Sequence, residues 1–245
     1  MKLVWAHFRA QMLLLVRTPA YAIPTMLFPA MFFLFFGVPS AGKGDPQTAN
    51  LLMASYAAFA VLGVAFYQFG VALAIERETP WSVYFRILPL RPHILFVARI
   101  LSASSFAFLS VTLVAVTAVL FTGVNVQAWG WLRLSAALLG GSLPFACLGI
   151  ALGYLVPPRS AVPMANLLYL PLAYAGGLWT GRNLPSPVAE LSPLLPSRRY
   201  AEVVWSAVSG MGWRLEDWIW LLEYAGAFAL LAVWAYRRDE GMRYR

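Results

Sequence analysis

Charged residues are scarce in this sequence, and their scarcity argues against a water-soluble fold. Only 11% of the 245 residues are Asp, Glu, Lys or Arg, whereas soluble domains carry about 25%. Hydrophobic residues make up 61%, and the mean hydropathy is +0.70. The uncharged runs reach the length of about 20 residues that a helix needs to cross a bilayer. The sequence therefore predicts a single-domain (1–245), all-α, polytopic membrane protein.

Cysteine and histidine are also nearly absent. Cys147 is the one cysteine and lies in an apolar run, so neither a disulfide framework nor a thiolate metal site is expected. The two histidines, His7 and His93, flank apolar runs, and neither a G-x-S-x-G nor an H-E-x-x-H pattern occurs. We therefore expect no catalytic centre, no metal and no cofactor on this chain.

Ionisable groups near the bilayer midplane, which ion-coupled carriers use, are missing from most of the apolar runs. Glu223 is the main exception, about a turn and a half inside the last run from its outer end. It either lines a polar cavity or reaches back to the interface, and the sequence leaves both open.

A complete phosphate-binding loop is absent as well, although "GVPSAGKGD" at 37–45 approaches one. Gly37, Gly42 and Lys43 fit the G-x-x-x-x-G-K spacing, but Gly44 stands where Ser or Thr should hold Mg²⁺. We expect neither a strand before this stretch nor a helix directly after it. Gly, Pro and Ser instead favour a turn that ends the first span, continued by Asp45 and Pro46.

Six apolar runs are long enough to span a membrane, because a helix satisfies its own backbone hydrogen bonds where no water is present. The predicted spans are 20–39, 50–75, 94–122, 131–156, 161–181 and 217–236.

An interfacial amphipathic helix is predicted before the first span, in residues 1–19. Its apolar residues recur at three- and four-residue steps, and its polar residues fall largely on the other side. The apolar set is Trp5, Phe8, Met12 and Leu15. The polar set is Lys2, Arg9 and Gln11.

The basic residues predict the orientation. Eighteen Lys and Arg against ten Asp and Glu give a net charge of +8. They cluster at the ends of apolar runs, which indicates lipid headgroups and topology rather than nucleic acid. With an inner N-terminus, twelve lie on inner segments and six on outer ones. Cytoplasmic loops carry the excess of basic residues, so both termini are predicted to be cytoplasmic, in the plasma (inner) membrane of a prokaryote.

Two connecting segments are too apolar for free loops. The inner loop, 76–93, contains "PWSVYFRIL", which predicts a short amphipathic helix that needs a covering surface. The outer segment, 182–216, is too polar to span. Its apolar residues and a predicted helix at Arg198–Ser209 indicate short re-entrant helices sheltered by protein.

These segments resemble the permease subunit of type-2 ABC exporters over nearly the whole chain. The resemblance is carried by "ERETPWSVYFRILPLRPHILFVARIL" after the second span, "NLLYLPLAYAGGLWTGRNLP" in and after the fifth, and "LSPLLPSRRYAEVVW" before the sixth. Glu76, Arg77, Glu78, Pro89 and Arg99 match the inner-loop pattern that members commonly show. Pro80 and Trp81 depart from that pattern, so the chain resembles a divergent branch.

The resemblance implies a mechanism. A separate ATPase subunit, carrying ATP and Mg²⁺, binds the inner loop, and two permease copies, identical or different, form the path between them. The implied coupling residues are Glu76, Arg77, Glu78, Trp81 and Arg86. The second and fifth spans usually line the path, which makes candidates of Tyr67, Gln68, Asn166 and Tyr169, with Glu223 from the sixth.

Two alternatives stay open at this point. The chain could instead be a membrane-embedded lipid-modifying enzyme or an assembly factor, although no catalytic constellation can be named. Glu76 and Arg77 could also cap and anchor the second span rather than transmit force to it.

Overall fold

The computed structural model describes residues 2–17, 19–42, 45–79 and 92–243, and every regular element within these ranges is helical. The α-helices, in chain order, are α1 (Lys2–Val16), α2 (Pro19–Phe32), α3 (Val38–Ala41), α4 (Pro46–Phe66), α5 (Ala72–Glu76), α7 (Pro92–Phe121), α8 (Ala128–Gly141), α9 (Leu143–Leu155), α10 (Pro158–Ala175), α11 (Ser186–Leu191), α12 (Pro196–Val208) and α13 (Leu215–Arg243). Two π-helical turns, η1 (Phe33–Gly37) and η2 (Tyr67–Val71), and one 3₁₀ turn, η3 (Ser192–Leu194), join some of them.

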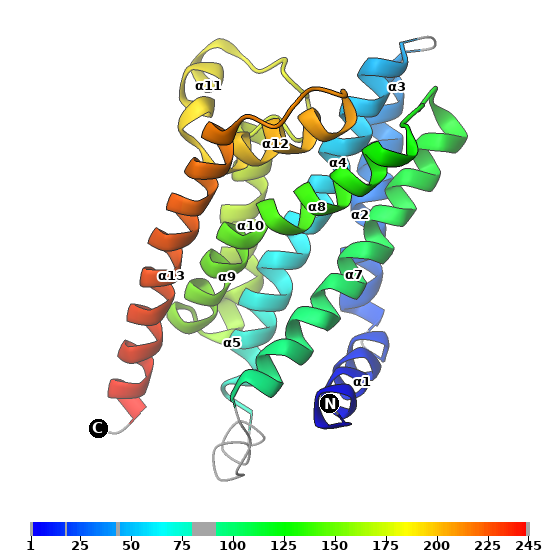
Figure 1. The fold of residues 1–245 in the computed structure, drawn as a ribbon. Helices are drawn as coiled ribbons and strands as arrows, with labels where there is room; N and C mark the ends of the chain where they lie inside the picture. Colours follow the sequence, from blue (N-terminus) through cyan, green and yellow to red (C-terminus); the bar gives the residue numbers. More distant parts are fainter. Residues whose placement is uncertain (1, 18, 43–44, 80–91, 244–245) are drawn as a thin grey trace.

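The helices form one bundle with two distinct ends (Figure 1). At one end lie α1, α5 and the C-terminal part of α13; at the other lie α3, α11 and α12. The all-helical, multi-pass architecture is as predicted from the uncharged runs.

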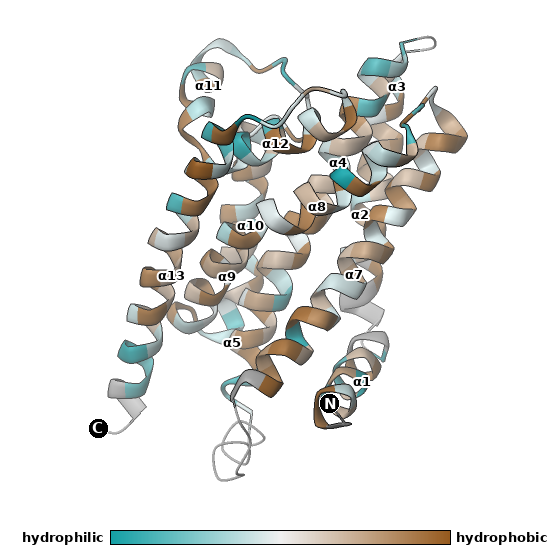
Figure 2. Ribbon diagram, viewed as in Figure 1, coloured by the Kyte–Doolittle hydropathy of each residue, from teal (hydrophilic) through white to brown (hydrophobic). Residues whose placement is uncertain are grey.

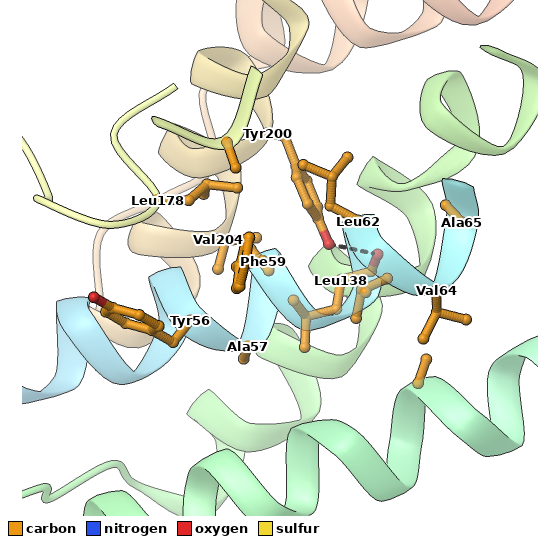
Figure 3. Close-up of a cluster of buried hydrophobic side chains, with 14 of the residues drawn as sticks. Tyr56, Ala57, Phe59, Leu62, Val64, Ala65, Leu138, Leu178, Tyr200 and Val204 are labelled. Carbon is orange, nitrogen blue, oxygen red and sulfur yellow. Dashed lines mark hydrogen bonds between the residues drawn. The ribbon is translucent and has the colours of Figure 1, made fainter. Parts of the chain in front are cut away.

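A central helix organises the bundle. This central helix consists of α4, η2 and α5, which run without a break from Pro46 to Glu76. In its 18-residue apolar stretch, 78% of the residues are buried inside the protein. The central helix contacts α2, α7, α9, α10 and α12. Figure 3 shows its Phe59 and Leu62 packed among Leu138 of α8 and Tyr200 and Val204 of α12. The Tyr200 hydroxyl donates a hydrogen bond to the Leu138 carbonyl at 3.1 Å.

The peripheral helices present apolar side chains outward instead. In the corresponding 18-residue apolar stretches, only 28% of the residues of α7 and 22% of the residues of α13 are buried. Leu230 of α13 is 74% exposed and Phe108 of α7 73%. Figure 2 shows hydrophobic residues along the middle of both helices and hydrophilic ones at the ends of the bundle. Water would penalise such surfaces, whereas hydrocarbon does not.

Four helices of the described residues are long and apolar enough to cross a membrane: Pro46–Glu76, Ile94–Phe121, Ala128–Leu155 and Leu215–Glu240. They correspond to the second, third, fourth and sixth predicted spans. The first predicted span contains a shorter apolar helix, Thr25–Ala41. The fifth corresponds to α10, which is absent from that set; Arg159, Asn166 and two internal prolines lower its hydrophobicity.

The stretch that approaches a phosphate-binding loop lies between α2 and α4. Part of it is itself helical, because α3 occupies Val38–Ala41, so the prediction of a turn was wrong for these four residues. The helix ends just before Gly42, which has a positive φ of 63°, a conformation that favours glycine. The expectation that no helix follows directly was wrong, because α4 begins at Pro46. Asp45 caps it, its carboxylate accepting the Gln47 and Thr48 backbone N–H groups at 3.0 and 3.2 Å. Hydrogen bonds lower the pKa of the Asp45 carboxyl, and the bond from the Thr48 side chain has the largest effect.

The outer segment forms short helices, as predicted, and α12 coincides closely with the helix expected at Arg198–Ser209. It is sheltered by protein: Trp205 is 1% exposed, and its indole nitrogen donates to the Ser55 hydroxyl at 2.6 Å. α12 packs on α4, α8 and α13.

The predicted N-terminal helix is present as α1, which packs against α7 and α2. Trp5 is 64% exposed and stacks on Phe8, as a lipid-facing pair would be. Gln11 differs from the expectation, since its side chain accepts a hydrogen bond from Ser102 of α7 at 3.0 Å. A buried hydroxyl next to the helix attracts the amide, because an unpaired polar group there would be costly.

A close backbone contact joins α9 to the central helix. A Cβ atom on Gly149 would lie 2.8 Å from the Ala65 carbonyl oxygen, and one on Gly153 would lie 2.9 Å from that of Gly70. Both opposing atoms are backbone and cannot rotate away. The G-x-x-x-G pair of α9 therefore packs helices within one copy of the chain.

We predict that Gly149→Ala destabilises the protein. The added methyl group meets backbone, and overpacking typically costs about 1–3 kcal/mol, more than the roughly 0.5–1 kcal/mol that alanine gains over glycine in a helix. Gly226→Ala in α13 is the matched control, because no atom lies within 4 Å of its added Cβ. Melting temperatures in one detergent should fall for the first variant only; equal values would contradict the contact.

Candidate functional site

Polar side chains from two predicted spans meet on the central helix. The Tyr67 hydroxyl of η2 donates to Asn166 Oδ1 of α10 at 2.8 Å. Tyr169, one turn further along α10, is 7% exposed and donates to the Phe59 carbonyl at 3.3 Å. The structure thus brings together three of the five residues predicted to line a path.

Gln68 is the fourth predicted path residue, and a π-helical turn sets its surroundings. The Ala72 N–H bonds to the Tyr67 carbonyl, five residues back, which widens the helix here. The Gln68 carbonyl accepts a hydrogen bond from Arg99 Nη1 of α7 at 3.3 Å. Its side chain is buried, and its amide nitrogen has no hydrogen-bond partner among the described residues. π-Turns often mark functional positions in helices.

Glu223, the fifth, lies apart from the other four. Its side chain is exposed on α13, a helix that packs on α9 and α12, whereas Tyr67 and Asn166 belong to η2 and α10. Within one copy of the chain, Glu223 therefore contributes nothing to the polar pair.

A row of four aromatic rings extends from Tyr169 toward the end of the bundle that carries α3. Phe59 stacks on Tyr169 with ring centroids 4.9 Å apart and an interplanar angle of 11°. Trp179 meets Phe59 edge-on at 5.6 Å, and Phe32 of α2 lies 5.6 Å from Trp179. We call these four residues the aromatic row. Gly63 makes room for it, because a Cβ there would lie 2.9 Å from the Tyr169 hydroxyl.

A cavity of about 470 Å³ opens where the aromatic row ends. We call it the aromatic cavity. Its lining residues are Phe32, Phe36, Ser40, Leu52, Tyr56, Trp179, Thr180 and Asn183. The Tyr56 hydroxyl donates to the Trp179 carbonyl at 3.2 Å and so fixes the loop that follows α10. Aromatic and neutral polar groups line the cavity, and among the described residues the Tyr56 phenol is its only ionisable lining group.

The predicted coupling residues begin at the other end of the central helix. Glu76 pairs with Arg99 of α7, and Arg77 pairs with Asp239 of α13. Arg77 Nη2 also donates to the Val156 carbonyl, just past the C-terminus of α9, at 2.9 Å. We call Glu76, Arg77, Arg99 and Asp239 the inner hub. It ties the start of the inner loop to three other helices.

The remaining coupling residues differ in what the structure describes. Glu78 is exposed at the last described turn before the gap, beside Thr79, whose hydroxyl donates to the Glu76 carbonyl at 2.6 Å. Trp81 and Arg86, with the short amphipathic helix predicted around them, lie outside the described residues.

Sequence reasoning missed the aromatic cavity, the two π-turns and Asp239. A signal for the cavity was available in "MFFLFFG", whose ring density exceeds what lipid contact requires. No such signal exists for Asp239, because a carboxylate beside Arg237 and Arg238 in a terminal segment has the pattern of an ordinary surface residue.

The fold and these features define a multi-pass helical membrane protein with a tightly packed central helix, an aromatic-lined cavity at one end and an ion-paired hub at the other. Comparison with known proteins identifies the family. Residues 2–200 match the family described as ABC-2 type transporter, and the chain therefore belongs to this family of transporter membrane subunits.

A relative from Bacillus subtilis (strain 168) supports this assignment. It bears the name "Putative transport permease YvfS" and is 26% identical over 237 residues, which are 95% of this chain and 96% of the relative. At 95% of this chain, the similarity necessarily extends past residue 200 into α13.

We predict that Arg77→Ala strongly destabilises the protein. The side chains of Arg77 and Asp239 are only 11% and 8% exposed, and removing one partner of a buried pair costs about 3–5 kcal/mol because the other charge is left uncompensated. Arg214→Ala is the control: Arg214 pairs with Glu216 but is 67% exposed, and such pairs contribute under about 1 kcal/mol.

Thermal unfolding in detergent, followed for both variants, checks this difference. The double variant Arg77→Met with Asp239→Leu should recover much of the lost stability, since it leaves no buried charge. Equal melting temperatures for Arg77→Ala and Arg214→Ala would contradict the importance of the inner hub.

Proposed function

We propose that this chain is the transmembrane permease subunit of an ATP-driven exporter in the plasma (inner) membrane of a prokaryote. Membership of the ABC-2 type transporter family supports a transporter subunit. The observation that carries the mechanism is the inner hub, because it links the start of the inner loop to the third, fourth and sixth predicted spans. A force applied to that loop would act on all of them.

In this proposal the chain crosses the membrane six times. Four helices meet the length and hydropathy that a span needs, and helix α2 with α3, and α10, complete the set. Because α10 contributes Asn166 and Tyr169 to the polar pair and the aromatic row, its lower hydropathy fits a helix that faces protein or a path rather than lipid. The segment 182–216, with α11 and α12, would be re-entrant from the outer side.

The proposed orientation places both termini in the cytoplasm. α1, the end of α5 and the end of α13 lie at one end of the bundle, which agrees with the single inner face required by the basic residues (Figure 1). The aromatic cavity then opens at the outer end.

ATP and Mg²⁺ would be held by a separate ATPase subunit that docks on the inner loop, 76–93. Glu78, exposed at the rim of that loop, would guide docking, and rim charges act mainly on association. Glu76 and Arg77 would then be rigid links, so that anchoring the span and transmitting force are one role. A second permease copy would complete the path on the exposed side of α10, where Leu167 is 64% exposed.

The alternative of a lipid-modifying enzyme has no observation in its favour. The chain belongs to a family of transporters, and the polar residues that the structure brings together are engaged in hydrogen bonds: Tyr67 donates to Asn166, and Tyr169 donates to the Phe59 carbonyl.

The first prediction here concerns topology. In a Cys147→Ala background, a cysteine at Pro187 should react with a membrane-impermeant maleimide added to intact cells, and one at Thr79 should react only after permeabilisation. The motivation is the twelve-to-six distribution of basic residues. Labelling of the Thr79 position from outside would invert the whole arrangement.

The second prediction separates docking from folding. Glu78→Lys should leave the melting temperature unchanged, because the side chain is exposed, yet it should reduce co-purification of the ATPase subunit. Glu190→Lys, an equally exposed charge reversal on α11 at the opposite end, is the matched control and should not affect recovery. Reversing a rim charge changes association several-fold. Equal ATPase recovery with both variants would argue against docking at this loop.

A further inference from the structure

We propose that the aromatic cavity binds an uncharged amphiphile, with a flat apolar part against the rings and a neutral polar part at the rim. The inference rests on the proposed function in one respect: it takes the bound amphiphile to be the molecule that the exporter transports. A volume of about 470 Å³ falls within the roughly 300–1,000 Å³ typical of small-molecule sites.

The rings supply the apolar wall. Phe32, Phe36, Tyr56 and Trp179 come from three separate segments, α2 with η1, α4, and the turn after α10. Their mutual contacts hold them in place: Phe32 lies 5.6 Å from both Phe36 and Trp179. Aromatic faces bury large areas and favour flat partners in offset or edge-on contact.

The polar groups gather at the exposed edge. Ser40, Thr180 and Asn183 are exposed, whereas Leu52 and Tyr56 are buried. The Ser40 hydroxyl already donates to the Phe36 carbonyl at 2.6 Å, so it offers an acceptor. The Asn183 amide can both donate and accept. This division matches a molecule with one apolar and one polar part.

Among the described residues, no charged side chain lines the cavity, and this lining favours an uncharged ligand over an ionic one. Arg182 is adjacent in sequence, but its guanidinium pairs with Glu202 at 3.0 Å and lies over the ring of Trp205. Burying an unpaired ion costs several kcal/mol, whereas a ring attracts a desolvated cation by only about 2 kcal/mol. The balance favours a neutral molecule.

The cavity also continues into the site described above. Phe32 and Trp179 line the cavity and belong to the aromatic row, which leads through Phe59 to Tyr169. The same chemistry, rings with few neutral polar groups, extends from the cavity to the Tyr67–Asn166 pair.

Protection of an introduced cysteine tests the proposal. The variant is Thr180→Cys in a Cys147→Ala background, full-length and in lipid nanodiscs, where both faces are accessible and topology has no influence. The labelling rate with a polar maleimide is measured with N-phenyl-1-naphthylamine, with its sulfonated analogue 1-anilinonaphthalene-8-sulfonate, and with tetraphenylphosphonium. These probes are neutral, anionic and cationic. Gly212→Cys, exposed and with open space around it, is the control position.

The neutral probe should slow labelling at Thr180→Cys about tenfold at ten times its Kd, by mass action, and leave Gly212→Cys unchanged. Adding Phe36→Ala should weaken that protection; Phe36 is 57% exposed, so its loss does not threaten folding. Equal protection by either ionic probe, or none by the neutral one, would overturn the proposal.

Further outcomes distinguish a transported molecule from a bilayer lipid, and failure of this inference from failure of the proposed function. Labelling that is slow in nanodiscs without probe but fast in lipid-free detergent would identify a bilayer phospholipid as the occupant and overturn the inference. If protection occurs but the neutral probe leaves ATP hydrolysis of the complex with its ATPase unchanged, the cavity is not on the export path. If ATPase recovery depends on Glu78 and no probe protects, the proposed function stands and this inference fails.

Discussion

Helices in a bilayer gain little from the hydrophobic effect, so close packing has to hold them together. In this protein, such close packing is found where α9 contacts the central helix. Gly149 and Gly153 leave no room for a side chain against the carbonyls of Ala65 and Gly70. The central helix is fixed in this way and enclosed by the helices around it, so the positions of both of its ends are defined.

The two ends differ in chemistry for a physical reason. At the end that carries the inner hub, Arg77 and Asp239 can be charged because each compensates the other and Arg77 also reaches the Val156 carbonyl. At the end that carries α3, rings and neutral polar groups line the aromatic cavity, and no charged side chain of the described residues does. The central helix therefore carries an ion-paired link at one end and a cavity walled by mutually packed rings at the other.

The π-turn at Tyr67–Val71 lies between these ends. It leaves the Gln68 carbonyl to Arg99, which also pairs with Glu76 of the inner hub. A single guanidinium therefore connects the middle of the central helix to its inner end. Arg99 thus forms a continuous set of contacts from the inner hub to Gln68, the residue next to Tyr67 of the polar pair.

The sequence by itself determined the all-helical, multi-pass character, the family resemblance and most helix positions, because uncharged runs and basic flanks are local signals that need no partner. It also selected Tyr67, Asn166 and Tyr169, whose polarity stands out in apolar runs. Only the tertiary structure decided that Glu223 lies apart from them, that Arg77 pairs with Asp239 162 positions away, and that rings from three segments enclose a cavity. These features depend on which faces of helices meet, and a hydropathy pattern that is apolar on every side of a helix carries no record of that.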